Sequence, residues 1–96
     1  MSKSYGFIEI TGVVAAMDAL DIMCKTADVE LASWERKLGG RLVTIIVQGD
    51  VAAVTEAVEA GIRVAESMTG VVQHYVIPNP EPGTQKMLKI SALDKD

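Results

Sequence analysis

Residues 42–61, LVTIIVQGDVAAVTEAVEAG, decide the fold, because an apolar run, a turn and an amphipathic segment follow one another there. The run from Leu42 to Val47 is rich in β-branched residues and has the length of a buried strand. Gly49 can adopt a positive φ, and Asp50 can accept backbone N–H hydrogen bonds at the start of a helix. The apolar residues behind this cap recur at three- and four-residue spacing: Val51, Val54, Val58, Ile62 and Ala65. The stretch therefore predicts a strand, a tight turn and a helix with one apolar face.

The composition predicts one domain with an aliphatic core. Of the 96 residues, 49% are hydrophobic but only 4% are aromatic, so Val, Ile, Leu, Met and many Ala must form the core. Each alanine removes little apolar area from water, so we expect further surface to be buried between subunits of an oligomer. The single cysteine excludes an internal disulfide.

The charge pattern and the start of the chain narrow the cellular setting. The net charge is −4, and the basic residues form no run with interleaved aromatics, so no nucleic-acid partner is predicted. The first residues contain no apolar signal region, and no apolar span of about 18 residues occurs. We therefore expect a cytoplasmic chain without a membrane partner.

Four strands and two helices are predicted along the chain. The strands are expected at residues 5–10, 27–35, 42–47 and 71–77, and the helices follow the first and third strands. The expected apolar face of the first helix comprises Val13, Ala16, Met17, Leu20, Cys24 and Ala27. Cys24 is thus predicted to be a small core residue rather than a reactive thiol.

An internal similarity supports a two-part arrangement. Residues 12–17 resemble residues 49–54, and both segments follow an apolar strand and open a helix. Two such halves give an α+β, ferredoxin-like βαββαβ fold, with a four-stranded antiparallel sheet and both helices on one face. The domain is expected to span residues 1–80. Residues 81–96 are expected to form a C-terminal extension with a short helix.

Few residues indicate catalysis. His74 is the only histidine, and no neighbouring Asp, Ser or Cys completes a catalytic set. The carboxylates show no metal-ligand spacing, and neither glycine turn matches a phosphate-binding pattern. No metal or cofactor is predicted, and an enzyme that uses His74 is the least favoured class.

Several motifs together resemble the bacterial microcompartment shell proteins, in the single-domain type that forms hexagonal tiles. The motifs are the start Tyr5–Glu9, the helix segment Ala16–Lys25, the signature Arg41–Val51 and the segment His74–Pro80. The resemblance implies a ferredoxin-like subunit, a homohexamer, and tiling with other shell proteins into the shell of a cytoplasmic, protein-bounded organelle. The resemblance is also compatible with contacts to encapsulated enzymes. It implies neither catalysis nor a cofactor.

The resemblance also assigns roles to individual residues. The pore loop of the family corresponds to the run Lys37, Leu38, Gly39 and Gly40, which Arg41 follows. Small polar or anionic metabolites are the expected solutes. The tile edge of the family carries a lysine that corresponds to Lys25, and Asn79 stands where an arginine often lies between two prolines.

The charge of the loop leaves two interpretations open. Arg36, Lys37 and Arg41, less Glu35, give about two net positive charges per loop, which would attract anions once symmetry brings the loops together. Alternatively, the arginines pair with acids on neighbouring chains, and the glycines line a neutral opening. The runner-up for the whole chain is a ligand-sensing regulatory domain of ferredoxin-like fold.

Overall fold

The computed structural model of the chain describes residues 3–78. Its elements, in chain order, are β1 (Ser4–Thr11), α1 (Val13–Thr26), β2 (Glu30–Lys37), the short 3-10 turn η1 (Leu38–Gly40), β3 (Leu42–Gly49), α2 (Val51–Met68) and β4 (Val71–Ile77). The predicted C-terminal extension, residues 81–96, lies outside the described residues.

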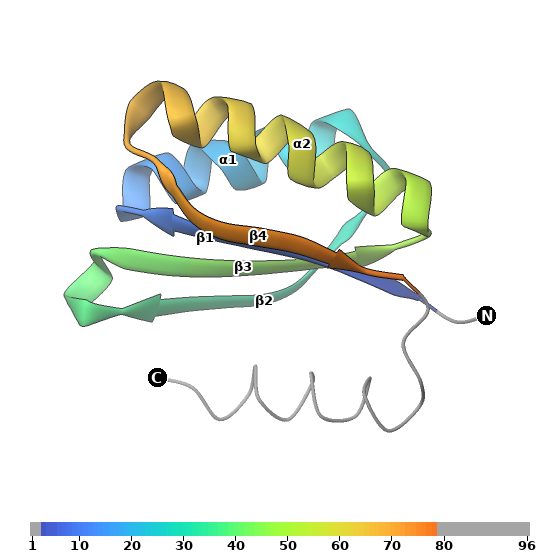
Figure 1. Ribbon diagram of the computed structural model, residues 1–96, viewed down its shortest axis with the longest axis horizontal. Coiled ribbons are helices and arrows are strands. Elements are labelled where there is room, and N and C mark those ends of the chain that lie inside the picture. Colours follow the sequence, from blue (N-terminus) through green and yellow to red (C-terminus); the bar gives the residue numbers. More distant parts are fainter. Residues whose placement is uncertain (1–2, 79–96) are drawn as a thin grey trace.

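The four strands form one antiparallel sheet in the order β2-β3-β1-β4. Both helices cover the same face of this sheet (Figure 1). The predicted ferredoxin-like βαββαβ fold is therefore confirmed. We call the face of the sheet opposite the helices the outer face.

The segment that decides the fold has the predicted elements, with one correction. Asp50 caps α2, and its side chain accepts a hydrogen bond of 2.9 Å from the backbone N–H of Ala53. β3, however, continues through Gly49, which has no positive φ. Gly49 is needed for space instead, because a Cβ at this position would lie 3.0 Å from the backbone oxygen of Asp28.

The core is aliphatic, as predicted, and small residues let its layers approach closely. Three fully buried alanines of α1 belong to this core: Ala15, Ala16 and Ala19. A Cβ at Gly61 of α2 would lie 2.7 Å from the sulfur of Met23, and one at Gly6 of β1 would lie 2.6 Å from a methyl group of Val58. Glycine at these two positions therefore sets the spacing between the two helices and between α2 and the sheet.

The predicted apolar face of α1 was wrong at two positions. Met17 is 57% exposed and Cys24 is also exposed, whereas Met23 is fully buried. The cause is the close packing of α1, which buries the stripe formed by Ala15, Ala16, Ala19 and Met23 and leaves Met17 and Cys24 outside it. Cys24 is thus not a core residue of the described chain. Partial burial, and then the Asp21 carboxylate, raise the pKa of its thiol, which favours the unreactive protonated form.

The second strand was also predicted with the wrong bounds. β2 begins at Glu30, and its pairing with β3 shifts register between Leu31 and Ser33. This irregularity changes the alternation: Leu31 lies opposite Val47 and Trp34 opposite Ile45, both core residues, whereas Ser33 lies opposite Ile46. Trp34 packs against the core, but Leu31, near the start of this edge strand, is 44% exposed. β2 also continues through Lys37, so the loop that joins it to β3 is shorter than predicted.

Candidate functional site

The loop between β2 and β3 has an unusual backbone. Leu38, Gly39 and Gly40 all have positive φ, at 53°, 68° and 94°. Glycine adopts such angles without penalty, whereas a leucine at positive φ costs about 1 kcal/mol. The Leu38 side chain is nevertheless 65% exposed. A strained residue that displays an apolar side chain is expected where function, rather than packing, sets the conformation.

Contacts with the start of α1 fix the position of this loop. The backbone N–H of Gly12 donates a hydrogen bond of 2.9 Å to the oxygen of Arg41, and the N–H of Arg41 donates one of 3.3 Å to Leu38. A Cβ at Gly40 would lie 3.1 Å from a methyl group of Val13, whereas nothing lies within 4 Å of one at Gly39. The loop is therefore anchored at Gly40 and Arg41 and open at Gly39.

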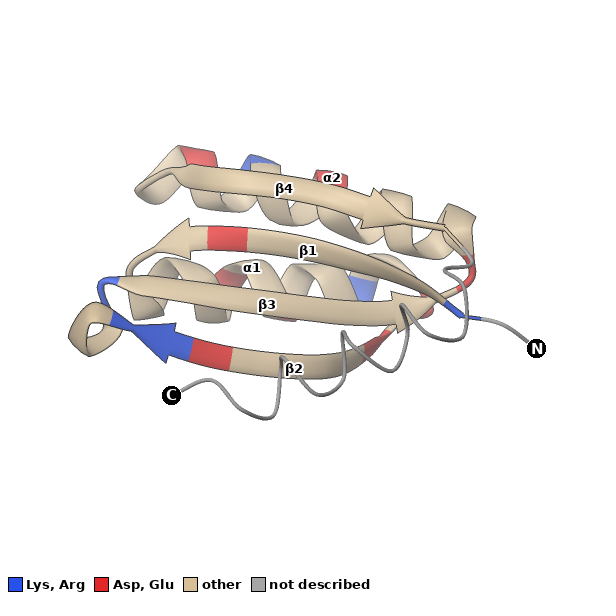
Figure 2. Cartoon of the chain, turned by 60° about the horizontal axis from the view of Figure 1, so that its bottom comes forward, with Lys and Arg blue, Asp and Glu red and all other residues tan. Residues whose placement is uncertain are grey.

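Cationic residues gather at this end of the sheet, at the end of β2 and the start of β3 (Figure 2). Arg36 and Arg41 are exposed, whereas Lys37 is half-buried. The structure therefore brings the predicted loop residues 37–41 together at one corner of the molecule.

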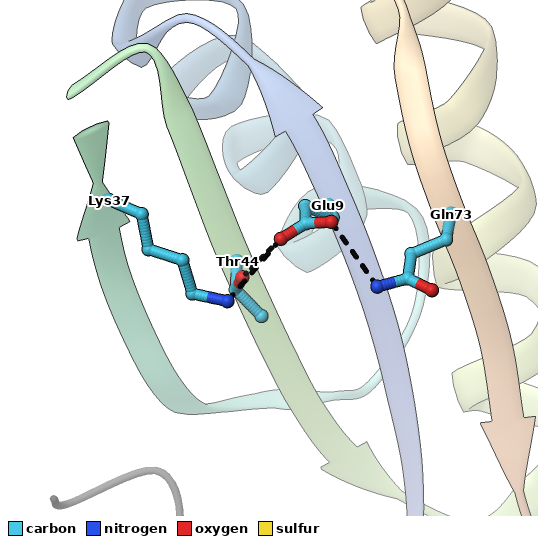
Figure 3. Close-up of polar contacts among 4 residues, drawn as sticks. All are labelled: Glu9, Lys37, Thr44 and Gln73. Atoms are coloured by element: carbon cyan, nitrogen blue, oxygen red, sulfur yellow. Dashed lines mark hydrogen bonds and ion pairs between the residues drawn. The ribbon is translucent and has the colours of Figure 1, made fainter. Parts of the chain in front are cut away.

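The side chain of Lys37 points away from the turn and onto the outer face of the sheet (Figure 3). Its Nζ lies 3.5 Å from Oε2 of Glu9 on β1, which is only 8% exposed. The same carboxylate oxygen accepts a hydrogen bond of 3.3 Å from the hydroxyl of Thr44 on β3. The other oxygen accepts one of 3.2 Å from the amide of Gln73 on β4. Glu9 thus links its own strand to the other three.

Sequence reasoning missed this cluster. The sequence marks Glu9 only as a residue of the first strand and of the Tyr5–Glu9 motif. Its partners Lys37 and Gln73 lie 28 and 64 residues away in the chain. One signal was available: Glu9 is an acidic residue in an otherwise apolar strand, and the predicted fold places that strand in the middle of the sheet. A charge buried there requires polar or charged partners from neighbouring strands.

The predicted edge residue Lys25 lies in the last turn of α1, on the surface. Its side chain is 69% exposed and donates a hydrogen bond of 2.9 Å to Asp21, as the predicted i,i+4 pair requires. This hydrogen bond and the charge of Asp21 raise the pKa of the Lys25 ammonium, so it stays charged at neutral pH. Asn79, the other predicted edge residue, lies outside the described residues.

Other functional groups are sparse in residues 3–78. His74 is exposed on the edge strand β4, and this part of the chain contains no group of three or more His, Cys, Asp or Glu residues that could hold a metal ion. None of the described helices is both long enough and apolar enough to cross a membrane.

Fold and loop together define a class of protein: a small ferredoxin-like module that presents a cationic glycine loop at one end of its sheet. The BMC domain model matches residues 4–80. The chain is 42% identical, over 86 residues, to the bacterial microcompartment shell protein PduA of Citrobacter freundii. The aligned region covers 90% of this chain and 91% of that protein. It is 38% identical to the shell protein EutM of Salmonella typhimurium over 89 residues, or 93% of this chain and 92% of that protein.

A solved structure shows the same fold. The crystal structure of a microcompartment protein from Desulfitobacterium hafniense superposes with a TM-score of 0.79 at 28% identity. The match covers 94% of this chain and 48% of that one.

This chain therefore belongs to the BMC domain family of bacterial microcompartment shell proteins. Members of this family are structural and assemble with other shell proteins. The protein is thus a component of a microcompartment shell and not an enzyme, and the resemblance drawn from its motifs is confirmed.

Proposed function

We propose that the chain forms a cyclic hexamer that tiles into the shell, with a central pore for small polar or anionic metabolites. The pore is lined by Lys37, Leu38, Gly39, Gly40 and Arg41 of each subunit, and Lys25 and Asn79 lie at the edge between hexamers. The observation that carries the proposal is the conformation of the loop, which projects an open glycine and an exposed leucine from a firmly anchored base.

Exposed apolar side chains support self-association. Large hydrophobic residues that are at least 44% exposed occur on both helices, in the loop and on both edge strands: Val14, Met17, Leu31, Leu38, Val51, Met68, Val72 and Tyr75. Such residues are normal when scattered singly, but this chain has a small core built largely from alanine and valine. Burial of even part of this surface between copies would add the stability that the core lacks.

The loop geometry suits convergence on a symmetry axis. Gly39 has no side chain and has open space around it, so the corresponding loops of several copies can approach closely. Once several loops converge, backbone N–H and C=O groups of the glycines can face a permeating solute. The exposed guanidinium of Arg41 favours anions at such an opening.

Assembly size tests the proposal directly. Native mass spectrometry or sedimentation at micromolar protein should give a single species of about six chains, because a cyclic hexamer is a closed assembly. A stable monomer or dimer over the same concentrations would contradict it. Electron microscopy of concentrated samples should show sheets or tubes.

Replacement of Lys25 by alanine should abolish sheets or tubes while leaving the hexamer intact. The long stem of Lys25 can lie along a neighbouring edge while its ammonium remains hydrated. Negative-stain microscopy reports the sheets, and native mass spectrometry reports the hexamer.

Asp21→Asn is the matched control for this variant, because it removes the ion pair with Lys25 but keeps the lysine. Sheets should persist in this control, since an exposed pair contributes at most about 1 kcal/mol. Normal sheets from Lys25→Ala would show that this residue has no part in the edge.

A further inference from the structure

The cluster around Glu9 bears on the charge of the proposed pore. Lys37 begins the pore loop, and its charge was expected to act with those of Arg36 and Arg41. In the structure its ammonium lies against the Glu9 carboxylate on the outer face, across β3 from its own strand.

The ammonium of Lys37 compensates the charge of the buried Glu9 carboxylate. The Glu9 side chain is only 10% exposed, and a buried carboxylate is costly unless it is paired and hydrogen-bonded. Of the three donors that reach it, Thr44 and Gln73 are neutral, so only Lys37 supplies an opposite charge. The lysine side chain is itself only 34% exposed, so the pair is screened less than a surface pair.

We propose that Glu9 sets the charge of the pore loop by holding the Lys37 ammonium on the outer face of the sheet. The pair is neutral, so Arg36 and Arg41 less Glu35 leave about one net positive charge per loop instead of about two. Glu9 is thus a positioning residue that acts on permeating anions through Lys37. This inference rests on the proposed pore.

The proposal can be tested without the pore, through the reactivity of individual lysines. An amine-acylating reagent, followed by peptide mass spectrometry, gives the modification rate of each lysine in the folded protein. Lys37 should react more slowly than the exposed Lys25. In Glu9→Gln the ratio of the Lys37 rate to the Lys25 rate should rise about fivefold, as expected when one hydrogen bond to a charged group is lost.

Glu30→Gln is the matched control. Glu30 pairs with Lys3 at 3.2 Å at the other end of the sheet, and its carboxylate is exposed. Hydrogen bonds from Lys3 and then Gln48 lower the pKa of this carboxyl, so it is charged at the same neutral pH. The control should leave the reactivity of Lys37 unchanged. Equal rates for Lys37 and Lys25 in the unaltered protein, or an unchanged ratio in folded Glu9→Gln, would overturn the proposal.

A second readout separates charge control from simple loosening of the loop. With hexamers in a planar bilayer under a salt gradient, Glu9→Gln should shift the reversal potential toward higher anion preference, because Lys37 is released. The double variant Glu9→Gln/Lys37→Met removes both charges and should return to the value of the unaltered protein.

If the pair only stiffened the loop, the reversal potential of the double variant would differ from that of the unaltered protein at least as much as that of Glu9→Gln does. That result would contradict the proposal.

Failure of this proposal can be distinguished from failure of the proposed pore. If the chain forms no hexamer, the proposed pore is contradicted. The modification rate of Lys37 still shows whether Glu9 protects this lysine. If Glu9→Gln alone does not fold, the double variant and the lysine modification rates of the unaltered protein still test the proposal. A Lys37 that reacts as fast as Lys25 in the unaltered protein excludes the pairing with Glu9.

Discussion

Replacement of Ile45 by alanine is expected to lower the free energy of unfolding by about 3 kcal/mol, within the range of about 2–5 measured for buried isoleucine and leucine. Ile45 is completely buried in β3 and lies opposite Ile8 on one side and Trp34 on the other. The substitution leaves a cavity in the core between the sheet and the helices that cover it, and β3 cannot move to fill it without breaking its pairing with β1 and β2. For a domain of this size the melting temperature should fall by about 15 °C.

Val72→Ala is the matched control for this variant, because Val72 is also β-branched and in a strand but is 56% exposed. It should cost less than about 1 kcal/mol. Both proteins should be melted at one fixed concentration, since assembly makes the apparent stability concentration-dependent. Equal losses in the two variants would show that β3 is not the centre of the core.

The parts of the fold that could be predicted are those with local signals. A β-branched run and an acidic cap act on neighbouring backbone, so the strand before Asp50 and the helix after it were predictable from the sequence alone. The antiparallel sheet with both helices on one face followed from the repeated strand–helix pattern, because right-handed crossovers leave few arrangements open.

The errors came from contacts made over long distances in the chain. An alanine-rich helix offers two similar apolar stripes, and only its contact with α2 decides that Ala19 is buried and Met17 is not. The register shift in β2 has no local marker, so the sequence alone could not show that Leu31 and Ser33 lie on opposite faces of the sheet. The pairing of Lys37 with Glu9 depends on the fold bringing β2 and β1 to either side of β3.

These long-range contacts also explain why the motif could propose pore residues but not the direction of each side chain. A motif gives the order of Lys37, Gly39 and Arg41 along the loop. Which of the cations face the opening depends on the acids that the sheet places nearby, and Glu9 is such an acid for Lys37. Arg41 is exposed and its backbone is held by hydrogen bonds, so it is the residue on which the charge of the proposed pore depends most strongly.

Arg41→Glu should reverse the ion preference of the proposed pore. Each loop changes from about one net positive charge to about one net negative charge, and a ring of about six loops changes by about twelve charges within a few screening lengths of about 8 Å. The reversal potential of hexamers in a planar bilayer should therefore change sign. In 1 M salt, where the screening length is about 3 Å, most of the difference should disappear.

Arg63→Glu provides the matched control, because it makes the same charge change at an exposed position on α2 rather than in the loop. Its reversal potential should stay close to that of the unaltered hexamer. Crystals grown with sulfate provide a second measurement, in which anion density on the symmetry axis beside Gly40 should be lost in Arg41→Glu and retained in Arg63→Glu. If both variants shift the potential equally, the net charge of the subunit and not the loop controls permeation. If the loops lie far from any symmetry axis, the pore assignment of residues 37–41 is wrong.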